Sequence, residues 1–311
     1  MSGAHSMRCF SRLPPLARSC LLAAAMLFSA ASHAQWATID WTIAETLLAI
    51  DAPVSGIAQQ PAYHDWVGEP HIPEHVSDIG LRTQPNLELL AQSPPEQTLL
   101  SPMFTGLVPR LERIAPVGTF ALYSPGADTW QEMQTLTRQL GELTEREAEA
   151  DALIKSTQRL MAELRYPGSD APALLMVQFM DARHVRVFGE NSLYNAVLEQ
   201  LALPNAWHEP TNAWGFALVG IEALARYPDA TLVVVDPLPT GVKAQLEKSG
   251  LWQHLPSVQH DRLLRLPPVW SFGALPSAQR FARELTNALY EPRGEPGSLA
   301  SYPRRLFRPL R

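Results

Sequence analysis

Short apolar runs alternate with amphipathic segments along most of the chain. In the first half, strand-like runs lie at 36–39, 54–58, 97–100 and 120–123. The helix-like segments between and after them lie at 42–50, 87–91 and 130–140. The second half repeats the order, with strand-like runs at 173–180, 185–188 and 231–235 and a helical segment at 192–201. This alternation predicts β-α-β units on mostly parallel sheets, and therefore an α/β protein with two similar lobes.

A long helical segment separates the two halves. Residues 144–164 contain no Gly or Pro and are rich in Glu, Ala, Leu, Gln and Arg, which favour helix. Thr144 and Glu147 predict a capping box, and Pro167 with Gly168 predicts the stop. At 1.5 Å per residue such a helix extends roughly 30 Å, enough to join two lobes as a rod. An ordinary long surface helix of a single domain is the alternative.

These patterns divide the chain into five parts. We expect an N-terminal lobe at 35–143, a connecting helix at 144–165 and a C-terminal lobe at 166–291. The segment 292–311 has five arginines, four prolines and no periodicity, so we expect it to be a disordered basic tail.

The first 34 residues predict the compartment. Three arginines precede an apolar run at 21–31, which is followed by the small-residue site Ser32-His33-Ala34. This order is typical of a cleavable signal peptide over 1–34 and predicts an exported, periplasmic protein. No later segment is long enough to cross a bilayer, so we do not expect a membrane-embedded protein. Cys9 and Cys20 both lie in the removed segment, so the mature chain has no disulfide.

Removal of the signal peptide makes the chain more acidic. The whole sequence has 25 basic and 31 acidic side chains, and the segment removes three arginines and no acids. The mature balance of 22 against 31 is a formal net charge of −9. We therefore expect no nucleic-acid partner.

One loop is rich in side chains that can bind metals: His64, Asp65, Glu69, His71, Glu74 and His75. Their spacing matches no helical or cysteine-anchored ligand pattern, and Pro70 and Pro73 indicate a solvated loop. We predict no metal site there, although a protein that binds a metal ion directly stays an alternative. The chain also has no G-x-S-x-G elbow, no H-E-x-x-H helix and no Gly-rich phosphate loop, which argues against an enzyme.

Aromatic residues at loop-like positions are the strongest candidates for a binding surface. They are Trp66, Phe104, Trp207, Trp214, Trp270 and Phe272. Tryptophan is usually core, but Trp214 and Trp270 lie among turn residues. An aromatic-lined cleft with one fixed donor such as Arg82 would suit a large ligand with an apolar body and a polar centre.

Five segments resemble a known family when they are taken in order. They are Val76-Ser77-Asp78-Ile79-Gly80-Leu81-Arg82-Thr83-Gln84-Pro85-Asn86-Leu87-Glu88-Leu89-Leu90, Arg113-Ile114-Ala115-Pro116, Val187-Phe188-Gly189-Glu190-Asn191-Ser192-Leu193, Asn205-Ala206-Trp207 with Thr211-Asn212-Ala213-Trp214-Gly215, and Val269-Trp270-Ser271-Phe272-Gly273-Ala274. From about residue 36 to 290 the chain resembles the FhuD-like periplasmic proteins that bind ferric hydroxamate siderophores for ABC importers.

The resemblance implies two α/β lobes joined by one long α-helix, with the ligand cleft between the lobes. It implies that Arg82 contacts hydroxamate oxygens, and that Trp214 and Trp270 line the cleft. Two tyrosines of the family fall on Phe104 and Phe272, which keep the ring but lose the hydroxyl. Each lost hydrogen bond would be worth about 1 kcal/mol net. An arginine that is merely on the surface is the alternative for Arg82.

The resemblance also implies partners. The siderophore supplies every iron ligand, so we expect no cofactor and no metal-binding side chains. The loaded monomer would dock on the permease of an ABC importer and its ATPase. An acidic residue of each lobe makes that contact in related proteins; Glu222 matches in the C-terminal lobe. The N-terminal counterpart falls on Pro109, so Glu112 is a substitute candidate. Both carboxylates could instead be ordinary solvated charges.

Other ligands stay open at this point. The same scaffold hosts cobalamin, haem and catecholate siderophores, so the fold alone does not select the chelate.

Overall fold

The computed structural model describes residues 35–124 and 126–290. Its N-lobe, residues 35–143, is built on a five-stranded parallel sheet with the strand order β3-β2-β1-β6-β7. The strands are β1 (Trp36–Thr38), β2 (Val54–Ile57), β3 (Ser77–Asp78), β6 (Gln97–Leu100) and β7 (Val117–Thr119). β7 ends at Thr119, so the predicted strand at 120–123 is wrong.

Short helices and one hairpin follow the strands of the N-lobe. They are α2 (Trp41–Ala49), α3 (Gln60–Trp66), the β4–β5 hairpin (Gly80–Leu81 and Gln84–Pro85), α4 (Leu87–Gln92), the 3-10 helix η1 (Pro102–Leu107) and α5 (Val108–Leu111). Helix α2 begins at Trp41, one residue before the predicted start, because the Asp40 carboxylate caps it by accepting hydrogen bonds from the Thr42 and Ile43 amides. The cap holds the start of α2 at the carboxyl end of β1.

Two antiparallel helices lead out of the N-lobe: α6 (Thr129–Leu143) and α7 (Glu147–Leu164). The long helix was expected from Thr144 but begins at Glu147. Thr144 instead ends α6, where its hydroxyl donates to the Leu140 carbonyl at 2.7 Å. The predicted capping box is therefore wrong, and the end at Leu164 agrees with the prediction.

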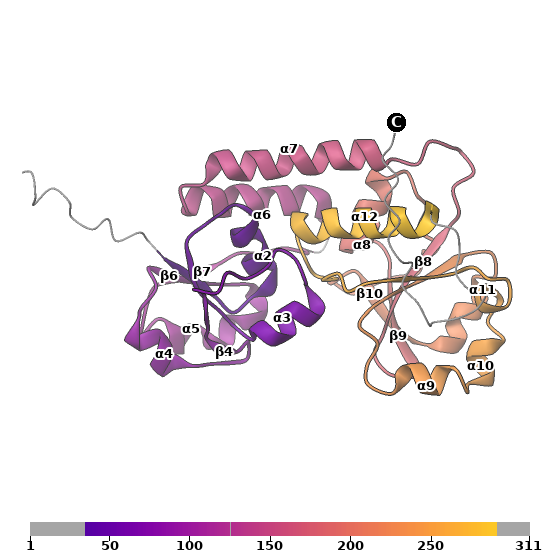
Figure 1. Cartoon of the computed structure of the whole chain (residues 1–311), viewed down its shortest axis with the longest axis horizontal. Coiled ribbons are helices and arrows are strands. Elements are labelled where there is room, and N and C mark those ends of the chain that lie inside the picture. Colours follow the sequence, from indigo (N-terminus) through magenta and orange to yellow (C-terminus); the bar gives the residue numbers. More distant parts are fainter. Residues whose placement is uncertain (1–34, 125, 291–311) are drawn as a thin grey trace, which may run out of the picture. The chain divides into compact units, whose positions relative to one another are not determined.

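Helix α7 is the link between the lobes. Its 18 residues correspond to about 27 Å. It packs against α6 and, in the C-lobe, against α8 and α12. Figure 1 shows α7 running alongside α6 and α12. The prediction of two α/β lobes joined by a long helix is confirmed.

The C-lobe, residues 166–290, has a five-stranded mixed sheet with the order β10-β9-β8-β11-β12. Its strands are β8 (Leu174–Phe179), β9 (His184–Phe188), β10 (Phe216–Gly220), β11 (Thr231–Val235) and β12 (Leu263–Leu266). β8, β11 and β12 are parallel, whereas β9 is antiparallel to both β8 and β10. The connection between β8 and β9 is too short for a crossover helix, which requires an antiparallel hairpin.

Helices cover this sheet: α8 (Leu193–Gln200), the 3-10 helix η2 (Ile221–Arg226), α9 (Val242–Leu246), α10 (Gly250–Gln253), α11 (Pro256–Gln259) and α12 (Leu275–Tyr290). Trp207 is 4% exposed and belongs to the core of the C-lobe. It is therefore a core residue and no candidate for the binding surface. Within the described ranges, no helix is long and apolar enough to cross a membrane. The predicted signal peptide at 1–34 and tail at 292–311 lie outside the described residues.

Candidate functional site

Arg82 lies in the turn of the β4–β5 hairpin. Gly80 has φ +85°, a conformation that L side chains rarely adopt, and its carbonyl accepts from the Gln59 amide at 2.7 Å. The Asp78 carboxylate accepts from the amides of Gln59 and Gly80, each at 3.0 Å. These bonds fix the hairpin to the start of α3 and hold Arg82 in place.

The Arg82 guanidinium is held by one carbonyl and three aromatic rings. Its Nε donates to the Ile39 carbonyl at 3.1 Å. Its Cζ lies 4.3 Å from the ring centroid of Trp41, 5.1 Å from that of Phe104 and 5.4 Å from that of Trp270. All three distances are within the range of cation–π attraction. The guanidinium is thus positioned by both lobes.

The charge of Arg82 survives this burial. Desolvation lowers the pKa of Arg82, and the nearby Asp40 carboxylate acts in the opposite direction. An arginine side chain remains protonated under any physiological condition. No residue in the described ranges accepts a hydrogen bond from its two terminal nitrogens. Arg82 can therefore offer two parallel N–H donors to a ligand.

The loop after β12 joins the C-lobe to the start of α2. The Thr42 hydroxyl donates to the Phe272 carbonyl at 2.7 Å and accepts from the Trp270 indole nitrogen at 3.2 Å. These contacts bridge segments about 230 positions apart in the sequence and place Trp270 beside Arg82.

A buried carboxylate secures the same junction. Glu45 of α2 is fully buried and accepts hydrogen bonds from the Ala274 amide and the Ser277 hydroxyl, at the start of α12. Desolvation raises the pKa of Glu45 to about 8, although these hydrogen bonds act against the shift. The sequence pattern predicts the helix that carries Glu45, but nothing in that pattern indicates that Glu45 contacts the start of α12.

Phe272 is the hub of an aromatic cluster. Its ring centroid lies 5.4 Å from Trp270, 5.7 Å from Trp214 and 6.5 Å from Tyr123, with the ring planes close to perpendicular. Trp214 is followed by Gly215, where a Cβ would lie only 2.4 Å from the Ser192 amide nitrogen. This close approach requires glycine and holds the backbone after Trp214 against Ser192, the residue before α8.

Tyr123 is a site residue that sequence reasoning missed. It is 6% exposed, and its hydroxyl donates to the Gly273 carbonyl, 150 positions away. Burial raises the pKa of Tyr123, so the hydroxyl keeps its proton. Its position in a predicted strand gave no reason to select it. A tyrosine directly before a turn of Ser, Pro and Gly is the one available signal.

A cavity opens between these side chains. Thr42, Arg82, Tyr123, Trp214, Trp270 and Phe272 are among the residues that line it. Of the five predicted ligand-binding residues, Arg82, Trp214, Trp270 and Phe272 meet at this cavity. The fifth, Phe104, is 6% exposed in the core of the N-lobe and packs against the Arg82 guanidinium. Phe104 therefore supports Arg82 from behind and is not among the lining residues.

The histidine-rich segment, whose first two residues His64 and Asp65 lie in α3 and not in a loop, forms no comparable site. Glu69 pairs with Arg280 at 2.9 Å, and His64 packs edge-on against the ring of Tyr63. Nowhere in the described parts of the chain do three His, Cys, Asp or Glu side chains come together as metal ligands would.

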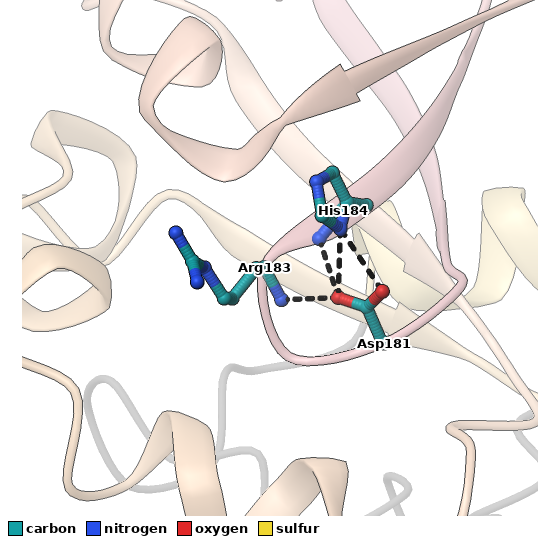
Figure 2. Close-up of polar contacts among 3 residues, drawn as sticks. All are labelled: Asp181, Arg183 and His184. Atoms are coloured by element: carbon teal, nitrogen blue, oxygen red, sulfur yellow. Dashed lines mark hydrogen bonds and ion pairs between the residues drawn. The ribbon is translucent and has the colours of Figure 1, made fainter.

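The predicted docking residue Glu222 is exposed in the first turn of η2. The Ile221 amide donates to the Arg183 carbonyl at 2.9 Å, which attaches η2 to the turn between β8 and β9. In that turn the Asp181 carboxylate accepts from the amides of Arg183 and His184 and contacts the His184 ring (Figure 2). Glu222 is therefore an exposed carboxylate on a well-supported segment.

The other docking candidate, Glu112, is exposed at the end of α5, where its amide donates to the Val108 carbonyl at 2.9 Å. Helix α5 and helix α10, which contacts η2, both lie on the side away from α7 (Figure 1).

Known proteins match most of the chain. The sequence model of the periplasmic binding protein family matches residues 37–269. The iron(3+)-hydroxamate-binding protein FhuD of Escherichia coli strain K12 is 34% identical over 253 residues, which cover 81% of this chain and 85% of that protein.

Solved structures give the same picture. The Fe3+-Desferal-bound siderophore-binding protein FhuD of Vibrio cholerae superposes with a TM-score of 0.76 at 30% identity, covering 83% of this chain and 98% of that one. The petrobactin-binding protein YclQ of Bacillus subtilis has a TM-score of 0.67 at 14% identity, covering 83% and 93% of the two chains. The second match shows a shared fold alone.

Proposed function

Because the chain belongs to the periplasmic binding protein family, we propose that it binds a ferric hydroxamate siderophore and delivers it to an inner-membrane ABC importer. The observation that carries the proposal is the guanidinium of Arg82. It is fixed by one carbonyl and three rings, and its terminal donors are left unpaired by the described residues at an aromatic cavity. The relatives named for hydroxamate and Desferal binding support this substrate class.

The chemistry of the ligand fits the site. A ferric trihydroxamate presents oxygens with partial negative charge around the metal and an apolar backbone outside. The planar guanidinium of Arg82 can donate to two oxygens at once, which a lysine cannot reproduce. Trp214, Trp270 and Phe272 offer rings to the apolar part. The iron arrives already chelated, so the protein acts as a carrier and performs no reaction.

Ligand binding uses a partly buried aromatic cavity, whereas delivery to the importer would use charged residues that are exposed at the surface. Glu222 and Glu112 would meet basic residues of the permease after the ligand is bound, with the protein acting as a periplasmic monomer. Such rim charges change encounter rates and salt dependence more than they change ligand affinity.

Intrinsic tryptophan fluorescence tests the substrate class. Ferric hydroxamates should quench the emission at roughly micromolar concentration or below, whereas ferric enterobactin, a catecholate, should quench poorly. Trp214→Phe and Trp270→Phe should each reduce the quenching. Trp252→Phe is the matched control, because Trp252 is buried in the core of the C-lobe. A reversed order of the two siderophore classes would refute the proposed substrate.

A further inference from the structure

A second arginine lies near the cavity, on the C-lobe side. Arg186 is the third residue of β9, between Val185 and Val187, which point into the core of the C-lobe. Because side chains alternate along a strand, Arg186 projects from the opposite face. It is half-buried there, opposite Gln178 of β8 and Leu218 of β10.

The guanidinium of Arg186 packs on the aromatic cluster. Its Cζ lies 4.9 Å from the ring centroid of Phe216 and 5.5 Å from that of Phe272. Phe272 lines the cavity, and Arg186 is not among the residues that do. A ligand group that extends past the edge of Phe272 would therefore reach Arg186, whereas Arg82 packs on Trp270.

Arg186, like Arg82, has no carboxylate partner among the described residues. Arg265 of the same sheet pairs with Asp236 at 2.8 Å, and Arg280 pairs with Glu69. No carboxylate within residues 35–124 or 126–290 pairs with Arg186. Desolvation lowers the pKa of Arg186, since its cation is partly removed from water without an opposite charge nearby. An anionic ligand group would supply the missing partner.

From this arrangement we infer that Arg186 is a specificity-determining residue, which selects ferric hydroxamates that carry a peripheral carboxylate. The inference rests on the proposed function, because it assumes that a hydroxamate occupies the cavity. Arg82 meets the oxygens around the iron, and Arg186 meets the carboxylate at the edge of the ligand. A guanidinium and a carboxylate form two parallel hydrogen bonds, which makes the contact selective for that group.

Three ferric complexes with one hydroxamate body provide the test. Desferrioxamine B ends in an amine, its N-acetyl derivative ends in a neutral amide, and its N-succinyl derivative ends in a carboxylate. Wild-type protein should bind the succinyl complex about tenfold more tightly than the acetyl complex, as expected for a hydrogen-bonded contact between charges. The cationic amine complex should bind most weakly.

Variants then assign the preference to Arg186. Arg186→Gln should bring the ratio of succinyl to acetyl affinity close to one, while the affinity for the acetyl complex changes by about twofold or less. Arg186→Lys keeps the charge and should retain part of the preference. Arg183→Gln removes one positive charge from the exposed β8–β9 turn and is the control, for which the ratio should not change.

The outcomes separate the two claims. Equal affinity of the wild-type protein for the succinyl and acetyl complexes would overturn the inference. This comparison uses the wild-type protein alone, so it does not depend on whether a variant folds. The same preference in wild type and Arg186→Gln would also overturn it. If none of the three complexes binds to the wild-type protein, the proposed hydroxamate function fails, and the role of Arg186 fails with it.

Discussion

Glu45 makes the stability of the protein depend on pH. In the folded chain its carboxyl is fully buried between α2 and the start of α12, where desolvation raises its pKa to about 8 from the ordinary value of 4.5. The folded protein therefore keeps a proton at Glu45 over a pH range in which the unfolded chain has released it. The stability associated with neutral Glu45 is fully present below about pH 4.5 and is lost as the pH rises to about 8.

The size of this loss follows from the shift. One pKa unit corresponds to about 1.4 kcal/mol, so a rise from 4.5 to about 8 corresponds to a loss on the order of 5 kcal/mol. That is a large fraction of the stability of a typical domain. Glu45→Gln should remove the dependence, because a neutral amide has nearly the same shape. Its oxygen can accept from the Ala274 amide, and its nitrogen can donate to the Ser277 hydroxyl.

Urea unfolding of wild type and Glu45→Gln between pH 5 and 9 measures the effect. The two proteins should have similar stability near pH 5, and the variant should become progressively more stable toward pH 8, by about 1.4 kcal/mol per pH unit. Glu163→Gln, an exposed carboxylate on α7, is the control and should keep the wild-type dependence. A difference between wild type and Glu45→Gln that stays constant over this range would refute the reasoning.

Three further predictions concern binding and transport. Arg82→Ala should weaken siderophore binding by about 1.5–3 kcal/mol in a titration with little change in melting temperature, and Arg82→Lys should also weaken it; wild-type affinity in both would remove Arg82 from the site. Glu222→Arg should leave affinity unchanged but reduce cellular uptake and stimulation of the importer's ATPase, and normal transport by the double variant with Glu112→Arg would exclude this docking surface. X-ray scattering should show little change in the radius of gyration on binding, because α7 resists a hinge; a change as large as that of hinge-type binding proteins would contradict this.

Elements with strong local patterns were predictable from the sequence. The apolar runs at 54–58 and 97–100 correspond to β2 and β6, and the apolar run at 231–235 is β11. Helix α12 was not predicted, although Leu275, Ala278, Ala282 and Leu285 recur at helical spacing. Strand β10 lacks such a signal, because its residues are half-buried or exposed without a clear alternation.

The site was predictable only in part. The family motifs select Arg82, Trp214, Trp270 and Phe272, because each is embedded in a distinctive string of residues. The roles of Tyr123 and Glu45 come from contacts with residues 150 and more than 200 positions away, which no local pattern contains. Phe104 was selected from its position in the family motif. Its ring packs against the Arg82 guanidinium and does not line the cavity, which the motif alone does not show.

The junction between α2 and the loop after β12 has a consequence for how the ligand range can evolve. Trp270 takes part in this junction through its side chain, so replacing it would disturb the bond to Thr42. Phe272 takes part through its carbonyl, which every amino acid carries, and through the contact of its ring with Tyr123 at the cavity. A change of side chain at position 272 would therefore keep the hydrogen bond to Thr42 and lose only the ring contact with Tyr123. Position 272 is thus a place where the lining of the cavity can change while the backbone bond at the junction is kept.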